Sequence, residues 1–271
     1  MEKLQSALEK ARKTRQDQEA PFARGEPITK RPKRSADVED LWMALEPLEL
    51  HKKQLEKRRL VTREANAKAT PFDILRTKVL LQMRQNGWKR LAITSPMPSS
   101  GKSTTACNLA LGLGRQTDLR TMLLDLDLRH PSVGDFLGKV PDHGIGEVLS
   151  GDVAFAEQAM RYGPNVGFSM AKKPDIDPAR LLLAEETALA IDRIEADYRP
   201  DVMIFDLPSM LVNDDTRAFL KNVDCCLIVV RADKTRYGQF DVSEREIAEQ
   251  TNVLGVVLNA FSYGDAVGSN T

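Results

Sequence analysis

Apolar positions between residues 69 and 262 form two kinds of pattern that alternate along the chain. Short apolar runs predict strands over 91–94, 121–125, 166–170, 202–206, 225–231 and 253–259. Apolar residues at helical spacing predict helices over 71–85, 103–115, 184–198, 214–221 and 237–250. Apolar strands that alternate with helices are typical of a parallel sheet that is buried on both faces. We therefore expect an α/β fold in which a parallel sheet is sandwiched by helices.

Residues 1–68 follow neither pattern. They hold 17 Lys or Arg and 12 Asp or Glu, and prolines interrupt them around the basic run 30–34. Apolar residues, including Trp42, return between 38 and 60. We expect a charged, partly ordered arm over 1–68, the folded domain over 69–262 and a flexible tail over 263–271. The basic run is most simply a solvated linker, and attraction to an anionic membrane surface is the alternative.

The charge balance and the cysteines exclude several classes of protein. The 39 Lys and Arg equal the 39 Asp and Glu, so the surplus of +5 in the arm leaves −5 for residues 69–271. An acidic domain argues against nucleic acid as a partner. No apolar run approaches the roughly 20 residues that cross a bilayer, and no signal-peptide segment is apparent. Three cysteines lie in apolar stretches without metal-ligand spacing. We expect a cytoplasmic protein without disulfides or zinc.

A glycine–lysine–serine turn joins the strand predicted over 91–94 to the following helix. A phosphate-binding loop needs inward backbone N–H groups, a helix N-terminus, a lysine for the outer phosphates and a hydroxyl for Mg²⁺. The residues in the positions to bind nucleotide phosphates are Ser99, Ser100, Gly101, Lys102, Ser103 and Thr104, and the Ser103 hydroxyl is in the position to bind Mg²⁺. The alternative is an ordinary helix N-cap, but the strand–loop–helix setting favours a phosphate site.

Carboxylates follow two further strands. Asp125 and Asp127 stand at the end of the strand over 121–125, and Asp206 ends the apolar strand over 202–206. Parallel α/β sheets bind ligands at the carboxyl ends of their strands, and a buried carboxylate is costly unless it is paired or near a cation. We expect Asp125 and Asp206 to serve a magnesium ion. The alternatives are solvated turn aspartates and a helix N-cap.

The last two predicted strands end in Arg231 and Asn259. The amide of Asn259 has both a donor and an acceptor, which suits the edge of an adenine ring. Both residues are therefore candidates for nucleotide binding, although Asn is also common in turns.

These residues together resemble the bacterial tyrosine kinase family, the cytoplasmic kinase domains of capsule and exopolysaccharide assembly. That family belongs to the P-loop NTPases of the deviant Walker A type. The resemblance covers about residues 69–260, and its specific segments are 75–77, 94–105, 124–132, 178–182, 201–208 and 229–232.

The resemblance implies a Mg-ATP-dependent phosphotransferase. By position, Lys102 and Ser103 would hold the outer phosphates and Mg²⁺, and Asp206 would belong to the metal shell. Asp125 and Asp127 would complete the catalytic site, with Asp127 accepting the proton of the substrate hydroxyl. The resemblance also implies an activating membrane polysaccharide copolymerase (a chain-length regulator), a location at the inner face of the cell membrane, and assembly into a homo-oligomeric ring.

The chain departs from the family pattern in three places. The family's oligomerisation motif, a Glu and two Arg residues, corresponds here to Thr70, Asp73 and Arg76. Only Tyr263 lies beyond residue 240, where the family has a tyrosine cluster, and the phosphate loop is less rich in glycine than expected.

Three functions therefore stay open. The first is a protein tyrosine kinase. The second is a slow ATPase or nucleotide-switched regulator of a copolymerase. The third is a partitioning-type ATPase, against which the acidic domain and Met97, in the place of a signature lysine, both argue.

Overall fold

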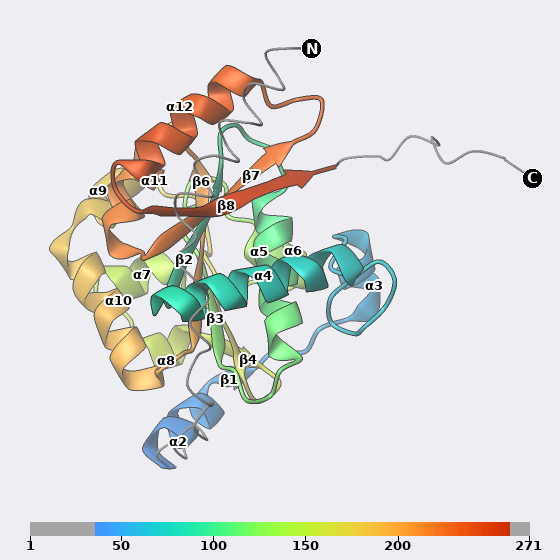
Figure 1. The fold of residues 1–271 in the computed structure, drawn as a ribbon. Helices are drawn as coiled ribbons and strands as arrows, with labels where there is room; N and C mark the ends of the chain where they lie inside the picture. Colours follow the sequence, from blue (N-terminus) through green and yellow to red (C-terminus); the bar gives the residue numbers. More distant parts are fainter. Residues whose placement is uncertain (1–35, 261–271) are drawn as a thin grey trace, which may run out of the picture. The chain divides into compact units, whose positions relative to one another are not determined.

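The computed structural model describes residues 36–260, which form an eight-stranded sheet (Figure 1). The strand order is β1-β4-β5-β3-β6-β2-β7-β8, and all neighbours are parallel except β4 and β5. The strands are β1 (Glu46–Pro47), β2 (Arg90–Ser95), β3 (Thr121–Asp125), β4 (Met160–Tyr162), β5 (Val166–Ser169), β6 (Val202–Ser209), β7 (Cys225–Arg231) and β8 (Asn252–Asn259).

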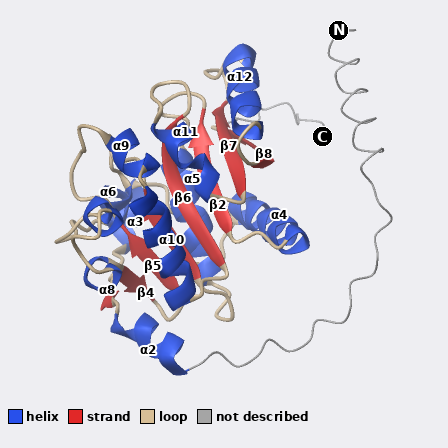
Figure 2. Ribbon diagram, turned by 90° about the vertical axis from the view of Figure 1, so that its left-hand side faces the viewer, coloured by secondary structure: helices blue, strands red, loops and turns tan. Residues whose placement is uncertain are grey.

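Helices cover both faces of the sheet, and each face has its own apolar core (Figure 2). One face carries α2 (Ala36–Ala44), α7 (Ile145–Leu149), α9 (Pro178–Leu183), α10 (Glu185–Tyr198), α11 (Asp215–Phe219) and α12 (Tyr237–Ala248). The other carries α3 (Lys52–Lys57), α4 (Thr70–Asn86), α5 (Lys102–Gly114) and α6 (Val133–Leu137). The short α8 (Phe155–Gln158) precedes β4, and a 3₁₀ turn (Leu220–Asn222) follows α11. This arrangement confirms the expected α/β sandwich.

The predicted elements all form, with small changes at their ends. The strands over 121–125 and 225–231 have the expected bounds, whereas β6 continues three residues further, because Ser209 pairs with Ser95 of β2. The elements that the pattern does not predict are α2, β1, α3, α6, α7, α8, β4 and α9, which have two to nine residues each. Such short elements show too few turns or alternations to give a period. Among the helices of the described part, we find none with the length and apolar character to span a bilayer.

The compact unit begins at Ala36, whereas the sequence suggested that the folded domain starts at residue 69. The side chain of Trp42 is fully buried, and its Nε1 donates a hydrogen bond of 2.7 Å to the carbonyl of Tyr198. The guanidinium of Arg120 lies 5.2 Å from the centre of the Trp42 ring. Residues 36–68 therefore supply part of the core. The basic run 30–34 and the tail 263–271 lie outside the described residues.

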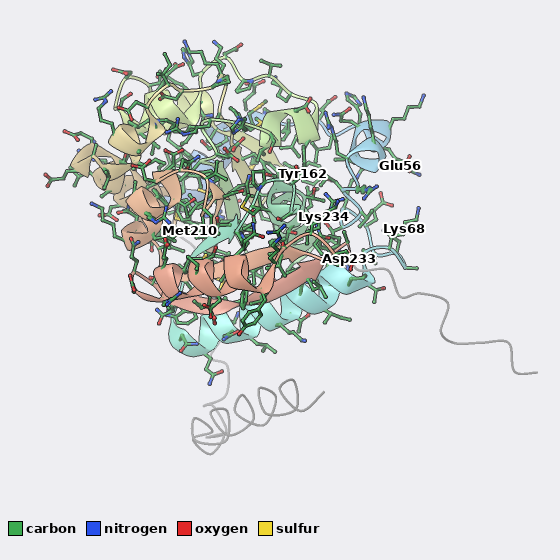
Figure 3. The ribbon with its side chains drawn as sticks, turned by 90° about the horizontal axis from the view of Figure 1, so that it is seen from above. Glu56, Lys68, Tyr162, Met210, Asp233 and Lys234 are labelled. Atoms are coloured by element: carbon green, nitrogen blue, oxygen red, sulfur yellow. The ribbon has the colours of Figure 1, made fainter. Side chains whose placement is uncertain are left out.

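A second attachment joins residues 59–62 to α5, close to the phosphate loop. The Asn108 side chain accepts a hydrogen bond from the Val61 N–H (2.9 Å) and donates one to the Arg59 carbonyl (3.0 Å). The Thr62 hydroxyl donates to the Asn108 carbonyl at 2.7 Å. Figure 3 shows Glu56 and Lys68 at the outer side of this segment. The segment between α3 and α4 thus supports the helix that carries Lys102.

Candidate functional site

The loop between β2 and α5 has the backbone of a phosphate-binding loop. Gly101, directly before α5, has a φ of +93°, and Ser99 has a φ of +61°. A Cβ atom at Gly101 would lie 2.0 Å from Nδ2 of Asn259 and would displace that side chain, so the close approach and the positive φ both favour glycine. The first N–H groups of α5 have no carbonyl partner within the helix, and such a helix start attracts anions.

The two residues that end β7 and β8 hold this loop in place. The Arg231 guanidinium donates a hydrogen bond of 2.9 Å to the Ser99 carbonyl, and the Asn259 amide donates one of 2.9 Å to the Ser100 carbonyl. The Ser100 hydroxyl in turn donates to the Met97 carbonyl at 2.7 Å. Arg231 and Asn259 therefore bind the carbonyls of the loop, a contact that the sequence analysis did not predict. A contact of Asn259 with adenine stays a prediction.

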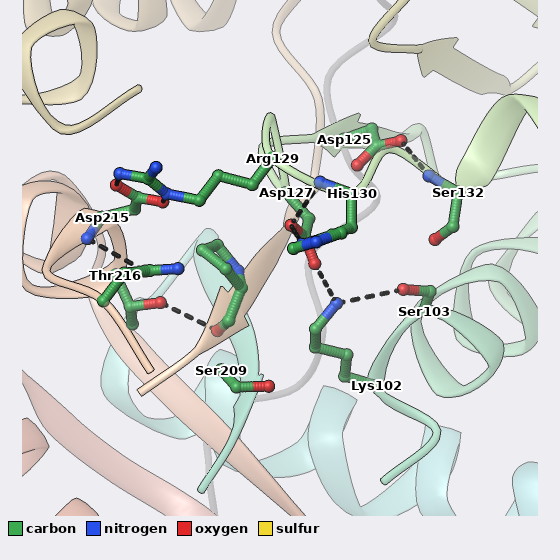
Figure 4. A network of polar contacts seen from close by, with 12 residues as sticks. Lys102, Ser103, Asp125, Asp127, Arg129, His130, Ser132, Ser209, Asp215 and Thr216 are labelled. Atoms are coloured by element: carbon green, nitrogen blue, oxygen red, sulfur yellow. Dashed lines mark hydrogen bonds and ion pairs between the residues drawn. The ribbon is translucent and has the colours of Figure 1, made fainter. Parts of the chain in front are cut away.

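Lys102 points to the end of β3 and forms an ion pair with Asp127 (Figure 4). The Nζ atom lies 2.5 Å from Oδ2 of Asp127 and 3.4 Å from the Ser103 hydroxyl. The two charged side chains are only 12% and 6% exposed. Burial lowers the pKa of Lys102, but the charges of Asp206 and Asp127 outweigh this effect and raise it. The lysine is thus a buried cation available for anionic ligands.

Asp125 is fully buried and held by the start of α6. Its Oδ2 accepts hydrogen bonds from the backbone N–H groups of Ser132 (3.1 Å) and Val133 (3.0 Å), while its Oδ1 has no hydrogen-bond partner. Burial, together with the charge of Asp206, raises the pKa of Asp125 to about 8.

Asp206 lies beside Asp125 on the neighbouring strand, and the two residues are in register. Neither carboxylate oxygen of Asp206 has a hydrogen-bond partner within the usual distance, although the side chain is fully buried. Burial raises the pKa of Asp206 to about 6, against the opposite effects of the Lys102 ammonium and the Ser103 hydroxyl. Three buried carboxylate oxygens, one of Asp125 and two of Asp206, thus lack a partner, which is costly unless a cation or its waters bind there.

The oxygen ligands at this site suit a Mg²⁺ ion that keeps water and phosphate ligands, rather than a metal ion bound by protein side chains alone. Within residues 36–260, no group of three His, Cys, Asp or Glu side chains could by itself hold a metal ion. Mg²⁺ typically takes one or two protein oxygens and completes its shell with water and phosphate. Ser103, Asp125 and Asp206 offer oxygens of this kind next to the phosphate loop.

An ion pair that sequence analysis missed fixes the loop after β3. Arg129 binds both oxygens of Asp215 at 2.7 and 3.0 Å, and the Asp215 side chain is only 1% exposed (Figure 4). Asp215 is the first residue of α11, so the pair ties the segment that carries Asp127 to the segment that follows β6. The only signal in the sequence is the position of Arg129, two residues after Asp127.

The three positions that replace the family's oligomerisation motif lie on α4. Asp73 accepts ion pairs from Arg115 (2.7 Å) and Arg76 (3.4 Å), and Arg76 also donates to the Gly112 carbonyl at 2.9 Å. Asp73 and Arg76 therefore connect α4 to α5 within the chain. Thr70 is the first residue of α4.

The carboxylate cluster predicts an unusual pH dependence of stability without nucleotide or metal. The raised pKa of Asp206, about 6, means that the folded chain keeps a proton that the unfolded chain has lost above about pH 4. Stability contributed by this group is present at low pH and is lost as pH rises through 6. We expect Asp206→Asn to raise the free energy of unfolding at pH 8 by about 3 kcal/mol and to change it little at pH 4.

Urea unfolding at both pH values, in the presence of a chelator, would measure this difference. The exposed Asp233 provides a matched control, since Asp233→Asn removes a charge without changing a buried site. A loss of stability in Asp206→Asn at pH 8 would show that the carboxylate is satisfied in the folded chain.

The fold and the loop define an α/β domain of the P-loop NTPase type, and solved structures share this fold. The kinase domain of the Escherichia coli tyrosine kinase Etk aligns over 74% of this chain and 81% of its own, with a TM-score of 0.66 and 24% identity. The chimerical protein CapA2B2 aligns over 83% and 98%, with a TM-score of 0.69 and 20% identity. The cell division ATPase MinD of Pyrococcus furiosus aligns over 65% and 74%, with a TM-score of 0.55 and 20% identity.

The sequence relatives are bacterial tyrosine-protein kinases. EpsB of Ralstonia nicotianae is 27% identical over 203 residues, which are 72% of this chain and 27% of EpsB. Tyrosine-protein kinase YwqD of Bacillus subtilis is 26% identical over 200 residues, 73% of this chain and 84% of YwqD. No family model matches the chain. The chain is homologous to the bacterial tyrosine-protein kinases, and it spans about a quarter of the length of EpsB and of E. coli Etk.

Proposed function

We propose that the chain is the Mg-ATP-binding domain of a tyrosine kinase of exopolysaccharide or capsule biosynthesis, and that it transfers the γ-phosphate of ATP to tyrosine. The observation that carries the proposal is the buried cluster at the carboxyl ends of β2, β3 and β6. It combines a lysine that is paired with one aspartate and two further aspartates, Asp125 and Asp206, in which three carboxylate oxygens lack a hydrogen-bond partner. Such a cluster is suited to a ligand that brings both phosphates and a divalent cation.

The residues of the cluster have separate tasks in this proposal. Backbone N–H groups at the start of α5 and the Lys102 ammonium bind the phosphates. Ser103, Asp125 and Asp206 would hold Mg²⁺, which would supply neutralisation of charge on the phosphates. Because phosphate oxygens compete with Asp127 for the Lys102 ammonium, nucleotide binding weakens the ion pair seen here. Asp127 is then able to accept the tyrosine proton while the tyrosine oxygen bonds to the γ-phosphorus and ADP leaves.

The setting of the enzyme belongs to the same proposal. We infer a cytoplasmic position at the inner face of the cell membrane and activation by a membrane polysaccharide copolymerase. Homology to tyrosine-protein kinases supports this setting.

The supply of tyrosines favours one alternative, a slow ATPase or nucleotide-switched regulator. Of the tyrosines in the described residues, Tyr198 is buried, Tyr162 is half-buried and Tyr237 is 80% exposed. Tyr263 lies outside the described residues. A chain with so few accessible tyrosines would phosphorylate itself at Tyr237 or Tyr263, would act on another protein, or would only bind and hydrolyse ATP.

The two functions differ in where the γ-phosphate goes. We expect the full chain with Mg²⁺ and γ-labelled ATP to transfer label to protein tyrosine, and Asp127→Asn to reduce transfer at least 100-fold while it keeps ATP affinity, because general base catalysis contributes about 10²–10⁴-fold. Labelled peptides would be identified by mass spectrometry, and an added tyrosine-containing polymer would detect transfer to other proteins.

Tyr237→Phe separates self-phosphorylation at α12 from transfer elsewhere. Label that appears only as free phosphate would support the ATPase or regulator instead. Full transfer by Asp127→Asn would remove this residue from the mechanism.

A further inference from the structure

The strand β8 forms one edge of the sheet, and in the described residues the part after its irregular start lacks the usual protection of an edge. Within the described part of the chain it pairs only with β7. Its eight residues, Asn252–Asn259, contain no charged side chain and no proline. Natural sheet edges are commonly protected by lysine, proline or bulges against pairing with another chain. The only irregularity in β8 is near its start, opposite Cys226 and Leu227, so residues 255–259 continue in regular register.

Apolar side chains are exposed along this edge. Val256 and Leu258 are 46% and 54% exposed on the face that carries α12. With Tyr237 and Phe240 of α12 they line an open cavity of about 520 Å³. Figure 1 shows α12 and β8 together at one end of the sheet. The free backbone edge and the apolar side chains thus form one continuous surface, which we call the β8 edge.

We propose that two copies of this chain join through the β8 edge, antiparallel about a two-fold axis at Val257, so that their sheets become continuous. In an antiparallel pair, directly opposite residues lie on the same face. Val256 and Leu258 share a face, and the register that places them opposite each other pairs Val256 of one copy with Leu258 of the other. Val257 then lies opposite its own counterpart. This register covers the exposed apolar side chains on both sides of the axis.

The position of α12 is compatible with this pairing. The helix packs over β7 and β8, and neighbouring strands are about 4.8 Å apart. A helix centred between β7 and β8 lies about one strand spacing from the axis, so the two copies of α12 would be about 10 Å apart, which is the distance of packed helices. At that distance the two copies of α12 can pack against each other above the joined strands.

Charges along α12 are complementary under the same symmetry. Phe240 lines the cavity beside Val256 and Leu258, so it lies near the axis. Arg236 and Glu244 are four residues before and after Phe240, and the two-fold axis brings Arg236 of one copy toward Glu244 of the other. Neither side chain forms an ion pair within residues 36–260. Asp233, in the loop before α12 (Figure 3), lines the same cavity. This self-complementarity favours a second copy over an unrelated strand.

Mass measurements of the full chain test the proposal without nucleotide, so the result does not depend on the proposed kinase activity. We expect light scattering and sedimentation equilibrium at about 50 μM to give twice the chain mass of 30.2 kDa. The double variant Val256→Lys/Leu258→Lys should return the mass to that of one chain. The matched control Ile74→Lys/Leu81→Lys changes two side chains on α4 that are 54% and 62% exposed, and should leave the dimer intact. Circular dichroism would confirm that each variant is folded.

Two further variants test the register and the charges. Val257→Cys should form a disulfide between copies on mild oxidation, whereas Leu258→Cys, which faces Val256, should form several-fold less. Arg236→Glu and Glu244→Arg should each weaken the dimer, and the two changes together should restore it. A wild-type chain that stays monomeric at 50 μM, or a dimer that survives Val256→Lys/Leu258→Lys, would overturn the proposal. A dimer without the Val257→Cys crosslink would overturn the register, and binding of a different protein at this edge in place of self-association would overturn the choice of occupant.

Discussion

Replacing Lys102 by alanine is expected to lower the affinity for Mg-ATP at least 100-fold. Hydrogen bonds between charged groups are worth about 1.5–3 kcal/mol each, and every 1.4 kcal/mol changes affinity about tenfold. Lys102 is in a position to make two such bonds to the outer phosphates, from a site that is only 12% exposed. Its loss also leaves the negative charges of Asp127 and Asp206 without their cation, so phosphates would meet repulsion instead of attraction.

Calorimetric titration would measure the affinity, and thermal unfolding would give an independent readout. Mg-ATP at about 100 times its dissociation constant stabilises a folded protein by about 2.7 kcal/mol, and this stabilisation should disappear in Lys102→Ala. Lys78, on the exposed side of α4, provides a matched control, because Lys78→Ala removes the same charge away from the loop. Unchanged affinity in Lys102→Ala would mean that the loop is not the nucleotide site.

The strands of this fold were predictable because they are buried on both faces. An apolar run such as 225–231 forms a buried strand whatever its neighbours in an α/β sheet. The strand β7 has the bounds that the run predicts. The strand order was not predictable from the pattern. Nothing in the sequence shows that β6 lies between β3 and β2, since strands 202–209 and 90–95 are separated by more than a hundred residues.

In the candidate site, too, the positions of the residues on their elements were predictable and their partners were not. Lys102, Asp125, Asp127 and Asp206 each follow or end a predicted strand, so the general rule about carboxyl ends brings them to one edge. The ion pair of Arg129 with Asp215 joins residues 86 positions apart and depends on the neighbourhood of β3 and β6. The hydrogen bond that the Asn259 amide donates to the Ser100 carbonyl likewise depends on the loop conformation. Sequence patterns locate such groups on their elements, but only the assembled sheet determines their partners.

The segment 36–68 shows why composition alone misplaced the start of the domain. Its charged residues surround isolated apolar ones, and its elements have two to nine residues, too few for a period. Yet Trp42 and Leu45 are fully buried, and Leu48, Leu50, Leu55 and Leu60 are at most 8% exposed. In this segment the positions of the apolar residues are determined by contacts with the core that the rest of the chain forms, and not by the period of a local helix or strand.

Removal of residues 1–68 is therefore expected to abolish folding, whereas removal of residues 1–35 should leave folding and ATP binding intact. Burying one large apolar side chain contributes about 1.5–3 kcal/mol, and a buried Trp is worth about 3–5 kcal/mol against alanine. The six such side chains between residues 42 and 60 together contribute about 10–20 kcal/mol, which is as large as the roughly 5–15 kcal/mol of net stability that proteins possess. Their loss would also expose the rest of the two apolar cores to which they belong.

Circular dichroism, thermal unfolding and ATP titration of the two truncated chains would check this prediction, with Trp42→Ala in the full chain as a graded version. The single substitution should cost about 3–5 kcal/mol, because it removes the ring that contacts Arg120 and Tyr198. It should leave ATP affinity unchanged wherever the chain is folded, since Trp42 lies at the opposite end of β3 from Asp125, next to Arg120. If the chain without residues 1–68 folded and bound ATP normally, the contacts of residues 36–68 would be accessory, and the domain would begin near residue 69.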